Sequence, residues 1–277
     1  MKTSFLSFGR ASSAFLVRVG SACVAVFVVV LVLGFAAGCD KPSKPPDSAR
    51  HAPPFGQQHR VNISDGSVLD LLPVAAGSFM MGDSTGNGDG VEKPVHKVSI
   101  SKPFWLGKTA VTQAQWKAVM GTSLQEQFDV AWNSSAECWP GKDNKESCLI
   151  TLKEFFKNYG LENYEDVKRR FLGNVGENFP MNWVSHDNAV AFCKKLTEQE
   201  RAAGRLPSGY EYGLPTEAQW EYACRAGTTG DYAGNLEAMA WYGKNSGGGT
   251  HAVAQKQPNA WGFHDMHGNV WEWCADW

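Results

Sequence analysis

Residues 258–277 read PNAWGFHDMHGNVWEWCADW, a sequence that fits neither an ordinary helix nor an ordinary strand. Gly and Asn recur along it and indicate turns, because these residue types adopt a positive φ at low steric cost. We therefore expect a buried, irregular segment, held by side-chain packing and by partners for its free backbone carbonyls. Large apolar side chains lie between the turns, namely Trp261, Phe263, Met266, Val270, Trp271 and Trp273.

Two acidic residues flank the central turn of this segment. Asp265 and Glu272 lie on either side of Gly268 and Asn269. Carboxylate and backbone carbonyl oxygens are the ligands that a hard cation such as Ca²⁺ takes, so the turn is a candidate cation site. The alternative interpretation is that both carboxylates accept hydrogen bonds from nearby backbone N–H groups. The local pattern leaves both interpretations open.

The composition is that of a loop-rich globular protein. A chain of 277 residues has room for one sizeable domain and an appendage. Its 11 Trp and 29 Gly residues favour loops that are stabilised by aromatic packing. The net charge of −2 gives no basic footprint, so nucleic acid is not an expected partner.

The N-terminus predicts export. Residues 1–38 combine a few basic residues with an apolar run over residues 19–38, as in a secretory signal peptide. The run ends in FAAGC, residues 35–39, which is similar to the lipobox of bacterial lipoproteins, in which the Cys, here Cys39, carries the lipid. An uncleaved signal anchor is the alternative, since the run is long enough to span a bilayer. Both interpretations place the domain in the bacterial cell envelope, on its periplasmic or extracellular face.

The remainder divides into a tether and a domain. Residues 39–66 are rich in Pro, Ser and charge and predict a disordered tether, and residues 67–277 predict the folded domain. Within the domain, the more polar block over residues 121–178 predicts an insertion on the surface.

Two cysteines of this block, Cys138 and Cys148, flank a short loop. In an oxidising compartment we expect them to form a local disulfide worth ~2–3 kcal/mol.

Regular elements are predicted between the loops. The apolar residues 68–81, interrupted by Pro and Gly, and the alternating residues 95–100 predict strands. Helices are predicted where a Ser or Thr precedes a helical pattern and caps its first N–H groups. The predicted helix starts are Thr112, Thr151, Ser185 and Thr216, and a further helical piece is expected over residues 164–172.

Three blocks along the chain resemble one protein family. They are GSFMMG (77–82) leading to VTQ (111–113), LPTEAQWEYACRAG (214–227), and PN (258–259) leading to GNVWEW (268–273). Together they resemble the sulfatase-modifying factor family, whose founding member is the formylglycine-generating enzyme. The resemblance covers about residues 68–277, apart from the block over residues 121–178. It implies an α+β fold related to C-type lectins, with little regular secondary structure.

The resemblance also implies calcium. In the family the final block wraps a structural calcium ion. The positions that match its ligands here are Asp265, Gly268, Val270 and Glu272. Asp265 and Glu272 would bind through their side chains, and Gly268 and Val270 through their backbone carbonyls. A second family calcium site begins at positions that match Asn245 and Ser246. Its remaining ligands lie in an acidic, aromatic stretch that is much shorter in this chain.

The family chemistry depends on residues that this chain does not match. The enzyme oxidises a cysteine of a target protein with O₂, through a copper(I) ion held by two cysteines downstream of the WEW block. No catalytic residue is therefore expected within this chain, the domain is expected to be incomplete at its C-terminus, and copper is expected only if residues beyond Trp277 supply the two cysteines. Cys193 and Cys224 match family cysteines whose disulfide partners lie in that same downstream part.

Other chemistries are poorly supported. His264 and His267 lie in a Gly/Asn-rich turn and lack the helical H-E-x-x-H spacing, so zinc is not expected. The three glycines at residues 247–249 lack the following Lys-Ser/Thr of a phosphate-binding loop. No G-x-S-x-G motif indicates a serine hydrolase.

Two hypotheses for the function follow. The first is an exported, membrane-tethered oxidoreductase of the formylglycine-generating type, which acts on a cysteine of a target protein such as a sulfatase. The second is a non-catalytic, lectin-like surface lipoprotein that binds a protein or glycan partner. Two closely spaced cysteines further along the reading frame would favour the first hypothesis.

Overall fold

The computed structural model describes residues 56–63, 66–83, 85–86, 92–134, 139–140, 149–157, 160–172 and 174–276. The predicted signal peptide, Cys39, Cys138 and Cys148 lie outside these residues, so the export, lipidation and local disulfide stay predictions. Within the described part of the chain, no helix combines the length and the apolar character needed to cross a bilayer.

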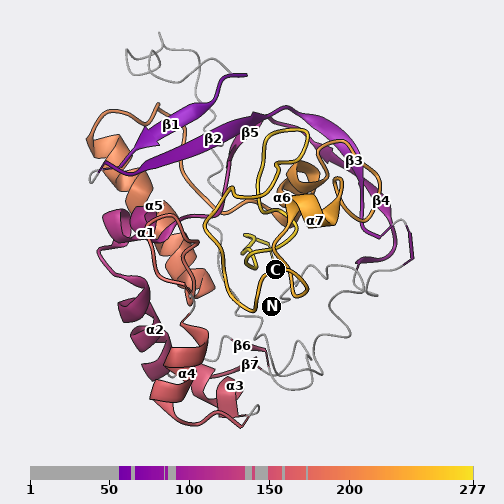
Figure 1. Cartoon of the computed structure of the whole chain (residues 1–277). Helices are drawn as coiled ribbons and strands as arrows, with labels where there is room; N and C mark the ends of the chain where they lie inside the picture. The colour runs from indigo at the N-terminus through magenta and orange to yellow at the C-terminus, as the bar shows by residue number, and fades with distance from the viewer. Residues whose placement is uncertain are drawn as a thin grey trace.

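The described strands form two small antiparallel sheets along the top of the molecule in Figure 1, and a third sheet, in which the two-residue strands β6 (Trp139–Pro140) and β7 (Leu149–Ile150) pair with each other, lies at the other end. The larger sheet has the order β1 (His59–Asn62), β2 (Val68–Val74), β5 (Phe104–Gly107). The smaller pairs β3 (Gly77–Met81) with β4 (His96–Ile100). The strands predicted at residues 68–81 and 95–100 are thus confirmed, although the two halves of the first run belong to different sheets.

Strand β1 corrects the predicted tether. Its residues lie within 39–66, yet they pair with β2 in register from His59↔Leu71 to Asn62↔Val68. Val61 and Ile63 are buried in the core. The tether prediction is therefore wrong for residues 59–63. Val61 and Ile63 alternate with polar residues and pack on one face of the sheet, and the polar composition of the surrounding region hides this pattern.

The predicted helices begin at their predicted caps. In α1 (Gln113–Met120) the Thr112 hydroxyl accepts the Gln115 N–H, and the Gln115 side chain accepts the Thr112 N–H. The same reciprocal box opens α6 (Glu217–Arg225) at Thr216, and Ser185 caps α5 (His186–Ala202). Each cap satisfies N–H groups that the first helical turn leaves without partners.

The block over residues 121–178 extends the core at one end of the molecule (Figure 1). Phe128 lies 5.2 Å from Trp183, measured between ring centroids, and Phe156 lies 5.7 Å from Trp183. The prediction of a surface insertion is therefore wrong for the helices of this block, which bury aromatic side chains in the main core. The elements are α2 (Leu124–Asn133), β6 (Trp139–Pro140), β7 (Leu149–Ile150), α3 (Leu152–Lys157) and α4 (Tyr164–Phe171).

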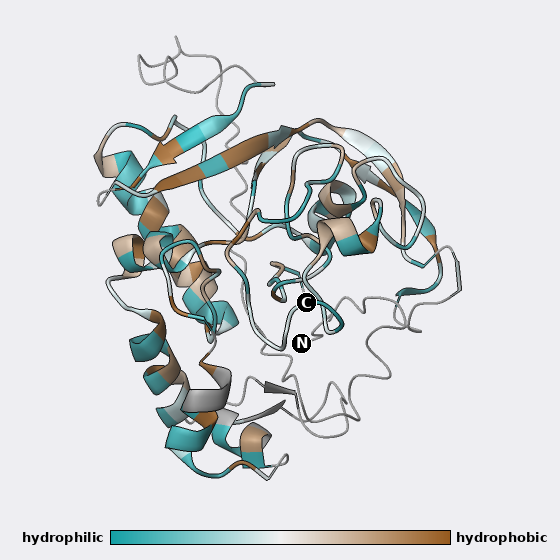
Figure 2. Cartoon of the chain, in the orientation of Figure 1, coloured by the Kyte–Doolittle hydropathy of each residue, from teal (hydrophilic) through white to brown (hydrophobic). Residues whose placement is uncertain are grey.

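The core consists of two apolar clusters that meet at β5. Trp105 packs into the cluster with the α1 and α5 helices, where Trp116 and Phe192 stack at 5.4 Å. Phe104 and Leu106 point to the opposite face and join the cluster beneath α6. Alternate strand residues face opposite sides, so one short strand serves both clusters. Figure 2 shows the apolar residues along β2, which lies between β1 and β5.

The C-terminal part is irregular, as expected. After the short helix α7 (Leu236–Met239), residues 240–276 form no helix or strand. Phe263, Met266 and Val270 are nevertheless buried against the α6 side of the core. Modest regular structure with mixed helices and strands agrees with the predicted α+β fold class.

Candidate functional site

Asp265 lies at the centre of the irregular segment and is almost fully buried, with 2% of its surface exposed. Its backbone adopts a positive φ of 61°. One carboxylate oxygen, Oδ2, accepts a hydrogen bond from the Ala254 N–H at 2.8 Å. The other oxygen, Oδ1, is buried and has no hydrogen-bond partner within the described residues. A buried acceptor without a partner is costly unless a water molecule or a cation satisfies it.

Glu272 places a second carboxylate in the same region. It accepts a hydrogen bond from the indole N–H of Trp220. Burial, together with the nearby Asp265, raises the pKa of Glu272 to about 8, although the hydrogen bond from Trp220 acts in the opposite direction. Burial also raises the pKa of Asp265. The raised pKa values show that two carboxylates share an environment that disfavours their charge, which a divalent cation would reverse.

The turn between Asp265 and Glu272 is held by hydrogen bonds to residues outside the final segment. The Asn269 N–H donates to the Trp241 carbonyl at 2.7 Å, and the Asn269 side chain bonds the backbone of His251 at both its N–H and its carbonyl. The Gly268 carbonyl accepts the Val270 N–H at 2.8 Å. The carbonyls of Gly268 and Val270 therefore belong to a tight turn, outside any strand ladder.

The donor types of these residues suit a calcium ion. They offer two buried carboxylates and two turn carbonyls, an all-oxygen set of the kind that Ca²⁺ prefers. The unpartnered Asp265 Oδ1 is the observation that favours a cation over simple capping of N–H groups. No group of three or more His, Cys, Asp or Glu side chains converges within the described residues, so the backbone carbonyls are essential to this set.

The second predicted calcium ligands have bonds of their own. The Asn245 side chain accepts the Tyr242 N–H at 2.8 Å and donates to the Ala240 carbonyl at 3.0 Å. The Ser246 hydroxyl accepts the Gly248 N–H at 3.3 Å. These bonds close a turn without a cation, and the second calcium site stays a prediction.

The two histidines of the turn serve different backbone groups. His264 contacts the Lys256 carbonyl through Nδ1 at 2.9 Å, whereas His267 accepts the Ala233 N–H through Nε2 at 2.9 Å. Burial lowers the pKa of His267 to about 4, so the ring is neutral at physiological pH. These contacts give each ring a structural role.

The three described cysteines are buried free thiols, namely Cys193, Cys224 and Cys274. Burial raises the pKa of each thiol, which keeps it protonated and unreactive. The Cys224 thiol lies 3.6 Å from the Met266 carbonyl and from His267 Nδ1. None of the three is therefore suited to act as a nucleophile.

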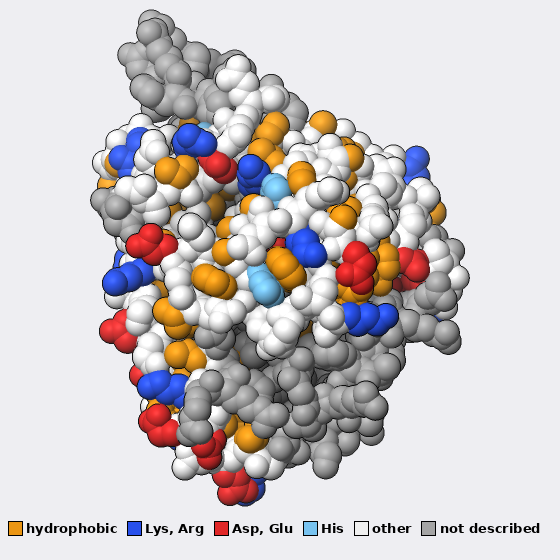
Figure 3. Space-filling model, viewed as in Figure 1, with side chains coloured by type: hydrophobic (Ala, Val, Ile, Leu, Met, Phe, Trp, Pro, Cys, Tyr) orange, Lys and Arg blue, Asp and Glu red, His pale blue; other side chains and the backbone are white. Residues whose placement is uncertain are grey.

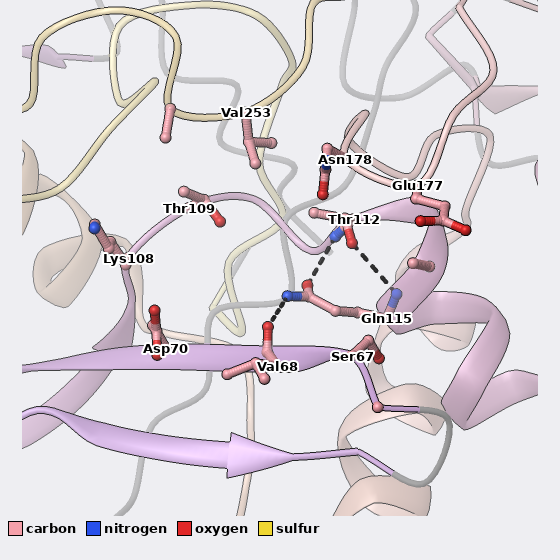
Figure 4. A pocket seen from close by; sticks show the side chains of 13 residues that line it. Ser67, Val68, Asp70, Lys108, Thr109, Thr112, Gln115, Glu177, Asn178 and Val253 are labelled. Atoms are coloured by element: carbon pink, nitrogen blue, oxygen red, sulfur yellow. Dashed lines mark hydrogen bonds between the residues drawn. The ribbon is translucent and has the colours of Figure 1, made fainter.

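A polar cleft with a volume of about 460 Å³ lies beside the segment that Asp265 holds. It is formed by the start of β2, the loop after β5, the first turn of α1 and two loops from the C-terminal half (Figure 4). This cleft was not predicted from the sequence, because its lining residues come from segments that lie far apart along the chain. The side chains that Figure 4 labels are Ser67, Val68, Asp70, Lys108, Thr109, Thr112, Gln115, Glu177, Asn178 and Val253.

Charges of both signs are interspersed on the face of the molecule that Figure 3 shows. No large patch of a single sign appears among the side chains described on that face. This distribution agrees with the net charge of −2.

The sequence and the fold agree on the family. A model of the sulfatase-modifying factor enzyme 1-like domain matches residues 60–277. The chain belongs to the sulfatase-modifying factor family. The matched region includes residues 60–62 of β1, in agreement with the corrected start of the domain. It also includes the final segment with Asp265 and Glu272.

Individual relatives of this family support the assignment. The chain is 31% identical over 241 residues to a formylglycine-generating enzyme of Streptomyces coelicolor, covering 76% of this chain and 70% of that protein. It is 28% identical over 237 residues to a chaperone protein LppX of Paenibacillus barcinonensis, covering 75% and 71%. Among solved structures, variable protein 1 of Treponema denticola superimposes with a TM-score of 0.54 at 25% identity, covering 79% of this chain and 77% of that one.

Proposed function

We propose that this protein is an exported oxidoreductase of the formylglycine-generating type, which acts on a cysteine of a target protein such as a sulfatase. The observation that carries the proposal is the similarity to the Streptomyces coelicolor enzyme, which extends over 241 residues and so includes the core as well as short motifs. In this chain the turn carries two carboxylates, of which Glu272 accepts a hydrogen bond from Trp220 and Asp265 accepts one from Ala254.

Calcium is proposed as a structural ion at this turn. Asp265, Glu272 and the carbonyls of Gly268 and Val270 would hold it, and the ion would supply the positive charge that the two buried carboxylates lack. Hydrogen bonds from residues of the turn hold the neighbouring loop. Asp265 holds Ala254 through its second oxygen, and Asn269 holds His251.

The described cysteines do not fit a copper centre. Cys193 belongs to one core cluster, whereas Cys224 and Cys274 belong to the other. Each is buried as a protonated thiol, while a copper(I) ligand is a thiolate. A copper centre of the family type therefore needs other residues than these.

The activity is tested with the full-length reading frame. The purified protein is incubated in air with a sulfatase that carries its unmodified cysteine. Copper(I) and an excess of a small thiol are supplied, because the cysteine yields two electrons and the reduction of O₂ to water takes four. Conversion of the cysteine to an aldehyde, detected by mass spectrometry and by hydrazide labelling, is the expected result. An unchanged cysteine under these conditions, in a folded sample, would contradict the proposal.

A non-catalytic binding function is the second candidate. It is favoured by the similarity to a relative named as a chaperone, a class of protein that binds polypeptides. Stable association with a target protein without cysteine conversion would support this candidate over the first.

We further propose that Cys39 carries a lipid that anchors the protein in the bacterial cell envelope. Residues 19–39 support this, because an apolar run ends in a lipobox-like sequence. Metabolic labelling with a fatty acid should mark the wild-type protein and leave Cys39→Ala unlabelled and absent from the membrane fraction. Equal membrane association of both proteins would instead support a signal anchor.

A further inference from the structure

We propose that the polar cleft beside β2 and the loop after β5 binds a peptide segment that carries one acidic and one basic side chain. The inference rests on the proposed function in one respect, because it names the place where the protein partner is held. The cleft, of about 460 Å³, is separate from the acidic turn and is assembled from five stretches of the chain.

The cleft presents one free charge of each sign. Lys108 and Glu177 lie at opposite ends of it (Figure 4). Lys108 is half-buried, Glu177 is exposed, and neither side chain forms an ion pair or a hydrogen bond within the described residues. By contrast, Asp70 on the same wall is already paired with Arg60 at 2.9 Å. A ligand in the cleft therefore meets a cation at one end and an anion at the other.

The walls of the cleft are fixed by hydrogen bonds before any ligand enters. The Gln115 side chain accepts the Thr112 N–H at 2.9 Å and donates to the Val68 carbonyl at 2.7 Å, which ties α1 to β2. On the opposite side, the Val253 N–H donates to the Asn178 carbonyl at 2.9 Å. A preformed site loses little conformational entropy on binding, which favours affinity.

The backbone conformation of Ala254 is a second observation that favours a functional role for this wall of the cleft. It has a positive φ of 59°, which is strained for a residue with a Cβ, and its N–H is held by the buried carboxylate of Asp265. Backbone strain of this kind persists only where the surroundings impose it, and it clusters at functional sites. The strained residue lines the cleft.

The lining selects among ligand classes. Polar side chains of Thr109, Thr112 and Asn178 line the cleft between the two charges (Figure 4). The Thr109 and Thr112 hydroxyls already bond Ala110 and Gln115, so it is the charges of Lys108 and Glu177 that an apolar ligand would leave without partners. A neutral glycan would leave Lys108 and Glu177 unpaired, and a polyanion would be repelled by Glu177. A peptide with charges of both signs is the ligand that uses both ends.

The test uses two series of acetylated, amidated peptides that contain no cysteine. In one series an Asp precedes a Lys by a spacer of one to four alanines, and in the other the Lys precedes the Asp. Binding to the full-length protein is measured by isothermal titration calorimetry.

We expect one order of the two charges to bind better than the other at one spacer length. In the Lys108→Glu/Glu177→Lys variant we expect the preferred order to be reversed. Exposed pairs contribute up to about 1 kcal/mol each, so the preference should be about two- to fivefold.

A control with the same net charge is available on α5. Lys194→Glu/Glu198→Lys exchanges two exposed charges outside the cleft and should leave the preference of the wild-type protein unchanged. No binding by any peptide, or the same preferred order in the wild-type protein and the cleft variant, would overturn the inference. Because the peptides lack cysteine, they cannot be substrates of the proposed oxidation. Failure of peptide binding is therefore distinguishable from failure of the oxidation assay. Circular dichroism confirms that each variant is folded.

Discussion

At the scale of single residues, Asp265 and Glu272 place two carboxyl groups in an environment that disfavours their negative charge. A carboxylate in such a place is stable only with a proton, a hydrogen-bond donor or a cation. Asp265 has one donor, the Ala254 N–H, and an oxygen without a partner. Glu272 has the Trp220 indole. We therefore expect the stability of the turn to depend on pH and on a bound divalent cation.

The first prediction concerns pH in the presence of a chelator. Because the pKa of Glu272 rises from 4.5 in a free side chain to about 8 in the folded protein, the folded state binds more protons than the unfolded state between these values. The free energy of unfolding should thus fall as pH rises from about 5 to about 8. Urea denaturation at several pH values measures this slope.

Glu272→Gln is the matched variant for this prediction. The amide oxygen can still accept the Trp220 N–H, while the titration is removed, so the slope should become smaller. An equal slope in both proteins would show that other groups cause the pH dependence.

The second prediction concerns the glycine of the turn. A Cβ at Gly268 would overlap the carbonyl oxygen of Trp241, which already accepts the Asn269 N–H. Gly268→Ala should lower the free energy of unfolding by about 1–3 kcal/mol, since the backbone must shift. Gly213→Ala is the control, because a Cβ there meets nothing within 4 Å and should leave stability almost unchanged. Equal denaturation midpoints for the two variants would refute this explanation.

At the scale of elements, Asn259 joins α6 to the final segment. Its amide group donates to the carbonyls of Ala223 and Cys224 at 2.8 and 3.1 Å. Its oxygen accepts the N–H groups of Trp261 and Phe263 at 3.0 and 3.2 Å. One buried side chain therefore satisfies both the end of a helix and the start of a turn, in a region without strands.

Asn259→Asp is the third prediction. The substitution replaces the donor group with an oxygen that faces two carbonyl oxygens, so it should destabilise the fold by about 3 kcal/mol or more. Asn62→Asp, at an exposed position in β1, is the control and should cost little. Chemical denaturation compares the two. A small effect at Asn259 would mean that water replaces the lost bonds.

At the scale of the whole molecule, the two apolar clusters share the β2–β5 pair. Phe104 and Leu106 face one cluster while Trp105 faces the other. Because these residues are adjacent on one strand, loss of either cluster removes support from the other. The molecule should therefore unfold as a single cooperative unit.

The fourth prediction tests this cooperativity. Phe128→Ala in one cluster and Phe263→Ala in the other should each cost about 3–5 kcal/mol, because both side chains are almost fully buried. In both variants, far-UV circular dichroism and tryptophan fluorescence should report the same midpoint. The exposed Val190→Ala serves as the control. Separate midpoints for the two probes would show that the clusters unfold independently.

The fifth prediction concerns calcium and the full-length protein. A ligand at 100 times its Kd stabilises the folded state by about 2.7 kcal/mol, so a calcium chelator should lower the melting temperature by about 5 °C or more. The Asp265→Ala/Glu272→Ala variant should melt lower and should not respond to the chelator. An equal melting temperature with and without chelator in the wild-type protein would refute a bound calcium ion.

The family, the fold class and the helix starts were predictable from sequence, because they depend on local patterns. Thr112 and Thr216 cap their helices through residues three positions away, and GNVWEW is a contiguous motif. Strand β1 was missed because its evidence is a pairing with β2, and the helices after residue 121 were assigned to the surface because their aromatic partner, Trp183, lies far along the chain.

Only the tertiary structure decided which groups meet. The sequence placed Asp265 and Glu272 near one turn, but their burial, the unpartnered oxygen of Asp265 and the bond to Ala254 depend on loops that pack from elsewhere. Likewise, Lys108 and Glu177 are unremarkable in sequence and share a cleft only after folding. The physical reason is range: caps and turns act over three or four residues, whereas burial and cleft formation depend on contacts between distant segments.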